Sequence, residues 1–311
     1  MANALAHDVL IRLGNHSFRE IFQCVRPFLQ PRLLLPPLRS PASPHTVTGN
    51  VSLVSDYRFR GISQTFKDPA IQGGFDYSHS SGVYLGTWAS NVYGGTNNSS
   101  AGVNYFNGGM EWDLYGGYKW EAFKDVTLDV GLLYYWYPGA KWAVATRDKY
   151  NNTEIYLGAA YKWFTVKYSH ALSNYFGMKG NTMGAGLGLA NGACGVAADG
   201  ATLTGNCAGN TTAGSKGSNY LDLGATFELG QGFNLVAHVG RASVKNYSFM
   251  NYTDWKIGVT KDWAGFTWGA AYIDTNAKAD VYRTAKIENA GVFKVRDTSN
   301  GTVVLSISKT F

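Results

Sequence analysis

The chain is poor in charge, in proline and in long hydrophobic runs. Charged residues make up 15% of its 311 positions, well below the roughly 25% that is usual for soluble domains. No run approaches the ~18 apolar residues that a membrane-spanning helix needs. After residue 45 the only prolines are Pro69 and Pro138. This composition is unlike both an ordinary soluble domain and a helical membrane protein.

Motifs that would indicate an enzyme or a cofactor site are also missing. Ser169 and His170 are adjacent, so in a strand they would lie on opposite faces and could not act as nucleophile and base. The glycine-rich segment 180–195 lacks the strand-then-helix pattern that surrounds a phosphate-binding loop, and we expect a flexible surface loop there. We therefore predict that the chain is not an enzyme and has neither a metal site nor a cofactor.

Residues 1–45 differ in composition from the rest of the chain. They hold five arginines against two acids and thus contribute +3 to a net charge of +6. The remaining +3 is too small a charge to indicate binding to nucleic acid. Their end is rich in proline, and they contain no run of 7–15 apolar residues of the kind that a secretory signal requires. We predict that 1–45 is an atypical, disordered segment without a clear signal peptide, and that 46–311 is a single domain.

What the sequence does contain is glycine, aromatic residues and period-2 alternation. There are 38 Gly, 20 Tyr, 16 Phe and 9 Trp residues. In 302–311, Val303, Leu305, Ile307 and Phe311 share one face and polar side chains share the other, as in a half-buried strand. Similar stretches predict twelve strands in all, near 47–57, 71–77, 82–92, 111–118, 126–132, 154–161, 164–168, 221–227, 233–239, 254–259, 266–272 and 302–311.

The lengths of the connections alternate strictly along the chain. Short connections are predicted at 78–81, 119–124, 162–163, 230–232 and 261–265, and long ones at 59–68, 93–108, 137–151, 170–218, 242–250 and 274–301. An antiparallel up-and-down barrel places all short turns on one rim and all long loops on the other, whereas a Greek-key sandwich has no reason to sort them. We therefore predict an all-β, twelve-stranded transmembrane barrel with short periplasmic turns and long extracellular loops.

Tryptophan and lysine recur together at the predicted short turns. The sequences are Tyr118-Lys119-Trp120, Tyr161-Lys162-Trp163 and Lys261-Asp262-Trp263. An indole at the level of the lipid headgroups beside an ammonium in water is typical of the aromatic girdle of a membrane barrel. Ordinary hairpin packing in a soluble protein is the alternative.

Several stretches resemble a proteobacterial family of proposed porins, the TorF (Gcw_chp) family. They are HTVTGNVSLVSDYRFRGISQ at 45–64, PAIQGGFDY at 69–77, GTWASNV at 86–92 and EWDLYGGY at 111–118. The resemblance covers about residues 45 to 311 and implies an outer-membrane barrel acting as a channel, with no catalytic motif and no established substrate. The chain departs from the family where residues 1–44 replace the expected signal peptide, and where Lys309 stands on the apolar face of the last strand.

The face opposite the apolar one gives the predicted pore lining. It comprises Asp56, Arg58, Asp76, Glu111, Asp113, Asp129, Glu154, Lys167, Asp222, Asp254 and Lys256, with His238 counted as neutral. Acids outnumber bases on this face, and fixed charges in a solvated lumen concentrate counter-ions. We therefore predict a weakly cation-selective pore for small solutes or ions. Twelve strands lie between a filled interior and an open channel, so paired charges that block permeation are the alternative.

Two rival functions follow from the same residues. A non-conducting barrel could use its extracellular loops to bind a surface partner, as an adhesin or receptor does. A soluble carbohydrate-binding sandwich is the more distant rival. An open lumen with measurable conductance distinguishes the channel from the first, and partition into detergent distinguishes a membrane barrel from the second.

Two further features concern the loops and the assembly of the barrel. Cys194 and Cys207 fall in the longest loop, where an oxidising compartment would favour a disulfide. Phe311 resembles the aromatic ending by which assembly machinery recognises outer-membrane barrels. The expected partners are therefore outer-membrane lipids, the barrel assembly machinery and small solutes.

Overall fold

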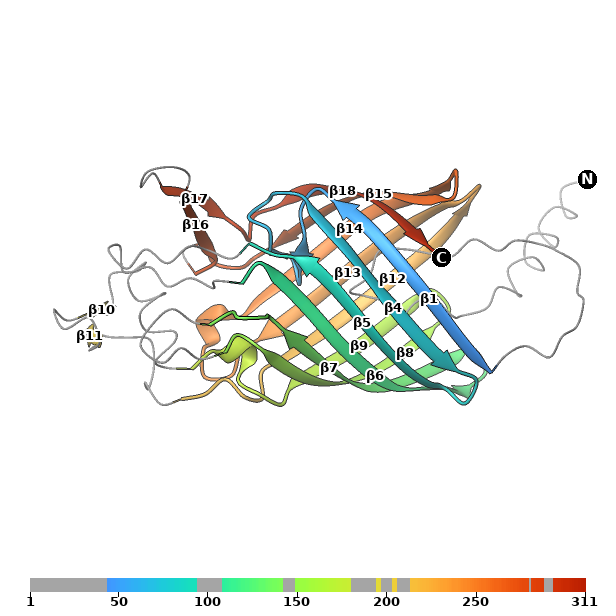
Figure 1. Ribbon diagram of the computed structural model, residues 1–311, viewed down its shortest axis with the longest axis horizontal. Coiled ribbons are helices and arrows are strands. Elements are labelled where there is room, and N and C mark those ends of the chain that lie inside the picture. Colours follow the sequence, from blue (N-terminus) through green and yellow to red (C-terminus); the bar gives the residue numbers. More distant parts are fainter. Residues whose placement is uncertain are drawn as a thin grey trace, which may run out of the picture.

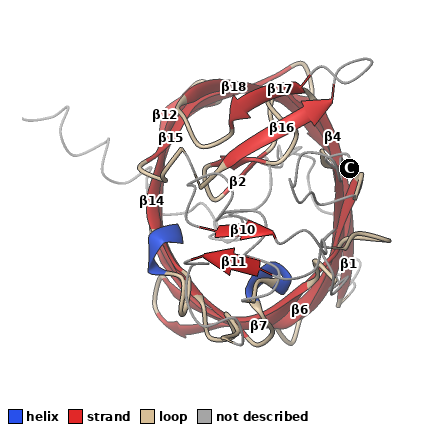
Figure 2. Cartoon of the chain, turned by 90° about the vertical axis from the view of Figure 1, so that its left-hand side faces the viewer, coloured by secondary structure: helices blue, strands red, loops and turns tan. Residues whose placement is uncertain are grey.

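The computed structural model describes residues 44–93, 108–141, 149–179, 194–196, 203–205, 213–279, 281–287 and 293–311. Among these residues, twelve strands form one closed antiparallel barrel (Figures 1 and 2). In order around the barrel they are β1 (His45–Val54), β18 (Thr302–Thr310), β15 (Phe266–Thr275), β14 (Tyr252–Trp263), β13 (Phe233–Ser243), β12 (Asn219–Gly230), β9 (Phe164–Ala171), β8 (Asn152–Tyr161), β7 (Val126–Trp136), β6 (Met110–Phe123), β5 (Val83–Asn91) and β4 (Ala70–His79). The predicted fold is confirmed.

Short elements lie in the long connections. They are the pairs β2 (Arg58–Phe59) with β3 (Ile62–Ser63), β10 (Cys194–Val196) with β11 (Leu203–Gly205), and β16 (Arg283–Ile287) with β17 (Phe293–Asp297), and the single 3-10 turns η2 (Tyr175–Gly177) and η3 (Ser248–Met250). No helix in the described part of the chain is long and apolar enough to cross a membrane. The predicted segment 1–45 lies almost wholly outside the described residues.

The alternation in the sequence becomes an apolar outer wall and a polar inner wall. Val47, Phe75, Leu132 and Ile257 are all more than half exposed on the outside, whereas their immediate neighbours along each strand face inward. A soluble protein would bury such side chains, but a barrel in lipid places them against acyl chains. Closure also pairs every wall strand on both sides, so no backbone edge is left unsatisfied in the lipid. The wall is that of an outer-membrane barrel.

Short turns and long connections fall on opposite rims, as predicted (Figure 1). The turn after β6 is shorter than expected, since β6 continues to Phe123 and pairs with β7 through Lys119–Asp129 and Glu121–Thr127, with a bulge before Phe123. Lys119 was therefore wrongly placed in a turn. It lies on the inner face, 3.8 Å from Asp129, because position 119 has the same parity as Glu111 and Asp113.

The Trp–Lys sequences otherwise lie at the short-turn rim. Trp163 and Trp263 are exposed there, and the Lys162 ammonium lies 5.1 Å from the Tyr161 ring. Lys309, the basic residue on the apolar face of β18, lies 5.2 Å from the ring of Phe266, the first residue after the β14–β15 turn. Its charge thus reaches the rim rather than the centre of the lipid-facing wall.

The β4–β5 turn depends on Gly82, which suggests a stability test. Gly82 has φ +100°, and a Cβ there would lie 2.1 Å from the Lys119 carbonyl oxygen. We expect Gly82→Ala to lower the free energy of unfolding by more than the ~1–2 kcal/mol that a left-handed alanine costs, since the backbone must also shift. Gly265→Ala is the matched control, because Gly265 has φ +78° and open space. Urea unfolding in detergent micelles measures both, and equal losses would contradict the steric argument.

Strand β1 ends earlier than predicted. The pattern extended the strand to Tyr57, on the outer face, but β1 stops at Val54 and Tyr57 is buried inside, only 5% exposed. The chain turns inward after Ser55, whose N–H donates to the Leu305 carbonyl at 2.9 Å. The apparent continuation of the alternation thus belongs to a connection rather than to the wall.

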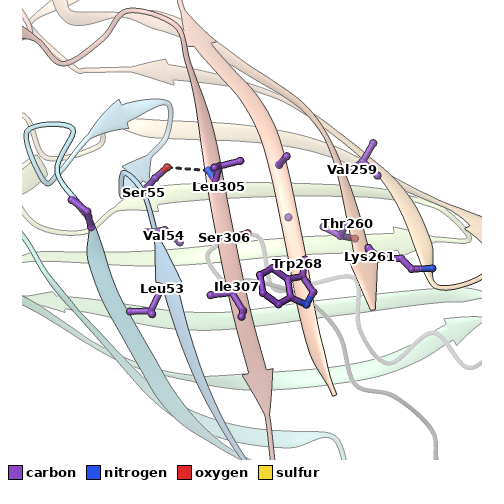
Figure 3. A pocket seen from close by; sticks show the side chains of 13 residues that line it. Leu53, Val54, Ser55, Val259, Thr260, Lys261, Trp268, Leu305, Ser306 and Ile307 are labelled. Carbon is purple, nitrogen blue, oxygen red and sulfur yellow. Dashed lines mark hydrogen bonds between the residues drawn. The ribbon is translucent and has the colours of Figure 1, made fainter. Parts of the chain in front are cut away.

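An apolar hollow of about 590 Å³ lies on the outer wall across β1, β18, β15 and β14 (Figure 3). Val259, Ala270 and Leu305 are register partners in one row, and the small Ala270 leaves room between its larger neighbours. Trp268 and Ile307 continue the lining toward the short-turn rim. Its apolar lining suits contact with lipid acyl chains.

Candidate functional site

The connection between β1 and β4, residues 55–69, folds into the barrel and is called the inserted loop below. Its strands β2 and β3 form a small hairpin that lies within the ring of wall strands when the barrel is viewed along its axis (Figure 2). The hairpin reverses at Arg60 (φ +49°) and Gly61 (φ +78°), two left-handed residues as in the tight turns that suit hairpins. A Cβ on Gly61 would lie 2.6 Å from the Asp254 Cβ, so glycine permits close contact with the wall.

Arg60 connects the inserted loop to the far side of the barrel. Its Nη1 and Nη2 atoms donate to Glu154 at 3.1 and 2.7 Å, and Nη1 also donates to the Tyr175 hydroxyl at 2.9 Å. Glu154 lies on β8, which is five strands from β1 in one direction and seven in the other. Burial disfavours the charged form, but the charge and hydrogen bonds of Glu154, together with Tyr175 and Tyr135, outweigh this and raise the pKa of Arg60. The pair therefore holds the inserted loop across the lumen.

Aromatic side chains pack around the inserted loop toward the long-connection rim. Phe59 lies edge-on to Tyr135 and Phe176, with ring centroids 5.5 and 5.6 Å apart. Tyr57 packs on Trp88 at 5.4 Å and donates to Glu111 at 3.1 Å. Burial and then the Glu111 charge raise the pKa of Tyr57, which keeps the phenol protonated as a donor. This cluster narrows the interior near the long connections.

The predicted pore-lining residues lie inside the barrel, and the acids have partners there. The partners are Arg58 for Asp56, Tyr115 for Asp76, Tyr57 for Glu111, Tyr84 and Lys119 for Asp129, Arg60 for Glu154, and His238 for both Asp222 and Asp254. Asp113 is buried on β6, and Lys167 lies 4.0 Å from the Tyr156 ring. Asp56 and Arg58 face inward from the inserted loop rather than from a strand of the barrel wall.

His238 bridges two carboxylates on the inner wall. Its Nδ1 atom lies 3.0 Å from Asp222 and its Nε2 atom 2.7 Å from Asp254. A neutral imidazole has only one donor nitrogen, and ionised carboxylates only accept. The geometry therefore fits an imidazolium, and counting His238 as neutral was wrong.

A cavity of about 200 Å³ lies between the inserted loop and the barrel wall, where residues of β1, β4, β7, β9, β12, β13, β14, β15 and β18 line it. Its charged lining residues are Asp56, Arg58, Arg60, Lys167, Asp222, His238, Asp254 and Lys256. The other predicted acids, on β4, β6, β7 and β8, do not line it. This cavity is the candidate functional site.

Sequence reasoning missed Arg60 and the path of the inserted loop. Residues 59–68 were assigned to an extracellular connection, yet they carry Phe59 and Phe66, and Phe66 is only 1% exposed. Two arginines and two phenylalanines within nine residues of a charge-poor chain were the available signal, because such a loop must pack against something. For the predicted disulfide, Cys207 and the side chain of Cys194 lie outside the described residues.

No group of three or more metal-ligating side chains occurs among the residues that the structure describes.

Comparison with known proteins gives a family and a set of similar barrels. The profile of the Gcw_chp family, described as "Bacterial protein of unknown function", matches residues 39–311. No curated protein matches the chain. Among solved structures, the KdgM porin is 5% identical with a TM-score of 0.43, covering 86% of this chain and 99% of its own. The NanC porin is 10% identical with a TM-score of 0.43, covering 85% and 98%. OccAB4 of Acinetobacter baumannii is 11% identical with a TM-score of 0.34, covering 82% and 56%.

Proposed function

The chain belongs to the Gcw_chp family of bacterial proteins, whose function is unknown, and we propose that it is an outer-membrane channel for passive diffusion of small solutes. One observation carries the proposal. The barrel is closed and apolar outside, and its inner wall keeps a cavity lined by charged side chains beside the inserted loop. A barrel that served only as an anchor would need no charged inner wall, since charges removed from water are costly.

The direction of the barrel follows from its two rims. In outer-membrane barrels the short turns face the periplasm and the longer connections face the outside. The inserted loop enters from the long-connection side, so it would constrict the channel from the extracellular end. A channel of the TorF type would have outer-membrane lipids, the barrel assembly machinery and small solutes as partners, and no catalytic role.

The ionic preference of the channel is expected to be weak. The eight predicted acids face Arg58, Arg60, Lys119, Lys167 and Lys256, and the His238 imidazolium is a sixth base. Eight acids against six bases leave a balance of two negative charges, and fixed charge in a lumen concentrates counter-ions. A slight cation preference therefore stays our prediction.

Planar bilayer recordings test the channel and its preference together. The full-length protein refolded in detergent should give discrete conductance steps, and the reversal potential under a salt gradient should have the sign of a cation preference. Absence of conductance from a barrel that shows heat-modifiable gel mobility would contradict the channel. It would instead favour the rival function, in which the barrel is non-conducting and its extracellular loops bind a surface partner. The aromatic side chains packed around Phe59 inside the barrel would be consistent with such a filled interior. A reversal potential of the opposite sign would contradict only the cation preference.

A further inference from the structure

The apolar hollow on the outer wall has a basic residue at one end. A single row of register partners crosses it, made up of Lys261 on β14, Trp268 on β15, Ile307 on β18 and Leu53 on β1. Figure 3 shows Lys261 and Leu53 at opposite ends of this row. Lys261 is the only charged residue among those that line the hollow, all of which the structure describes. The hollow therefore combines an apolar lining with one ammonium group.

The Lys261 side chain lies along the short-turn rim. Its Nζ atom donates to the Gln231 carbonyl and lies 4.0 Å from the Phe233 ring. An ammonium group has three N–H donors, so it can still bond to an acceptor from the membrane. Lys309, the next outward residue of β18 after Ile307, places a second cation on the same rim. The short-turn end of the hollow is thus positively charged.

Outward-facing acids are far from this end of the hollow. On β14, β15 and β18, all of whose residues are described, the only carboxylate at an outward position is that of Asp274. It lies about 20 Å along β15 from Trp268, at ~3.4 Å per residue. Asp262 is inside the wall, where it accepts a hydrogen bond from Thr267 at 2.6 Å. An anionic group from the membrane is therefore the complement of this rim.

We propose that the hollow binds one anionic phospholipid of the periplasmic leaflet, with an acyl chain in the hollow and the phosphate at the Lys261 ammonium. Short turns face the periplasm in outer-membrane barrels, so Lys261 and Trp268 lie near the headgroups of that leaflet. An indole and an ammonium are the groups that suit this level of a membrane. The site is on the outer wall, so it does not depend on whether the lumen conducts.

Packing explains why an acyl chain would remain in this hollow. Lipid tails are as apolar as the wall, so what holds a chain there is van der Waals contact rather than the hydrophobic effect. The small Ala270 lies between Val259 and Leu305 in the row next to that of Lys261. A chain seated over Ala270 contacts both larger side chains, whereas a smooth wall would offer one surface only.

The charge of the rim favours a lipid over a second copy of the protein. Copies of a membrane barrel keep the same orientation in the membrane. A two-fold contact through this face would therefore bring Lys261 and Lys309 of each copy to the same height and oppose like charges. A phospholipid phosphate meets the same groups with opposite charge.

Native mass spectrometry of the full-length protein in detergent tests the site, by titration with phosphatidylglycerol or phosphatidylcholine of the same acyl chains. We expect one phosphatidylglycerol to bind more tightly than phosphatidylcholine. Lys261→Gln should weaken phosphatidylglycerol about fivefold, as expected for one basic residue beside an anionic lipid, and leave phosphatidylcholine unchanged. Lys162→Gln is the matched control, because Lys162 lies at the same rim, 5.1 Å from the Tyr161 ring and away from the hollow.

A second pair of variants tests the acyl chain. Ala270→Leu fills the hollow and should weaken both lipids alike, whereas Ala225→Leu, at an outward position of β12, should weaken neither. All four substitutions leave the inner wall unchanged, so heat-modifiable gel mobility and conductance should match those of the wild type. A failed lipid site and a failed channel are therefore separate results.

Three outcomes would overturn the lipid site. They are equal binding of the two lipids by the wild type, equal effects of Lys261→Gln and Lys162→Gln, and unchanged lipid binding by Ala270→Leu. A dimer mass that Ala270→Leu abolishes would likewise reject the lipid and assign the hollow to contact between copies.

Discussion

Replacing Arg60 by Ala should release the inserted loop and raise single-channel conductance. The Arg60 and Glu154 side chains are 7% and 2% exposed, and removing one partner of a buried ion pair costs about 3–5 kcal/mol because the other charge stays buried and unpaired. Arg60 also lies 4.3 Å from the Tyr220 ring, so its loss weakens contacts on two sides of the lumen. Thermal unfolding in detergent and bilayer recordings of the same preparation measure both effects.

Two further variants show whether loss of the Arg60–Glu154 ion pair causes the changes in stability and conductance. Arg241→Ala removes an exposed arginine whose bond to Thr253 is 3.2 Å long, and it should change neither stability nor conductance. The double variant Arg60→Ala with Glu154→Gln removes the uncompensated charge, so it should recover part of the lost stability while keeping the higher conductance. If Arg60→Ala behaves like Arg241→Ala in both measurements, the inserted loop is held by other contacts.

The wall of the barrel could be predicted because lipid and water impose one rule on every wall strand. Each outward position must be apolar and each inward position can be polar, so period 2 reveals both the strand and its face. Val303, Leu305 and Phe311 were assigned to the outer face on this basis, and they lie there. The same parity placed Glu111, Asp113 and Asp254 on the inner wall without any knowledge of the pairing.

The inserted loop could not be predicted, because no periodic rule describes the path of a connection. Arg60 and Glu154 are 94 residues apart in sequence, and only the closure of the barrel brings them together. Lys119 was misplaced for a related reason, since only the pairing with β7 shows that β6 continues beyond Tyr118. The charge of His238 likewise depends on partners that come from two other strands.

The seam between β1 and β18 is the pairing that closes the barrel. It has five register pairs, against seven between β15 and β18. Beyond these pairs, Gly49 and Phe311 exchange both backbone hydrogen bonds, at 2.7 and 2.9 Å. The Phe311 ring covers Gly49 so closely that a Cβ there would lie 2.6 Å from its Cε2 atom. An aromatic ring over a strand glycine shields backbone that has no side chain of its own.

Deleting Phe311 should therefore impair assembly more than replacing it. Deletion leaves the N–H and C=O groups of Gly49 without partners in the wall, and each unsatisfied backbone group in lipid costs several kcal/mol. Phe311→Ala keeps these backbone bonds and loses only the ring, which contributes about 0.2–1 kcal/mol as a cross-strand neighbour. Phe311→Tyr keeps the ring as well. The fraction of protein with heat-modifiable mobility after refolding into lipid vesicles should fall in the order Tyr, Ala, deletion.

The same series separates closure of the seam from recognition by the assembly machinery. Refolding into pure lipid vesicles reports only closure, whereas the yield in outer-membrane fractions of cells also reports recognition. If Phe311 acts solely through the seam, both measurements rank the variants in the same order. If it is also an assembly signal, Phe311→Ala should refold well in vesicles and yet fail to accumulate in cells. Equal yields for the deletion and the wild type in vesicles would show that the five register pairs close the barrel without the Gly49–Phe311 bonds.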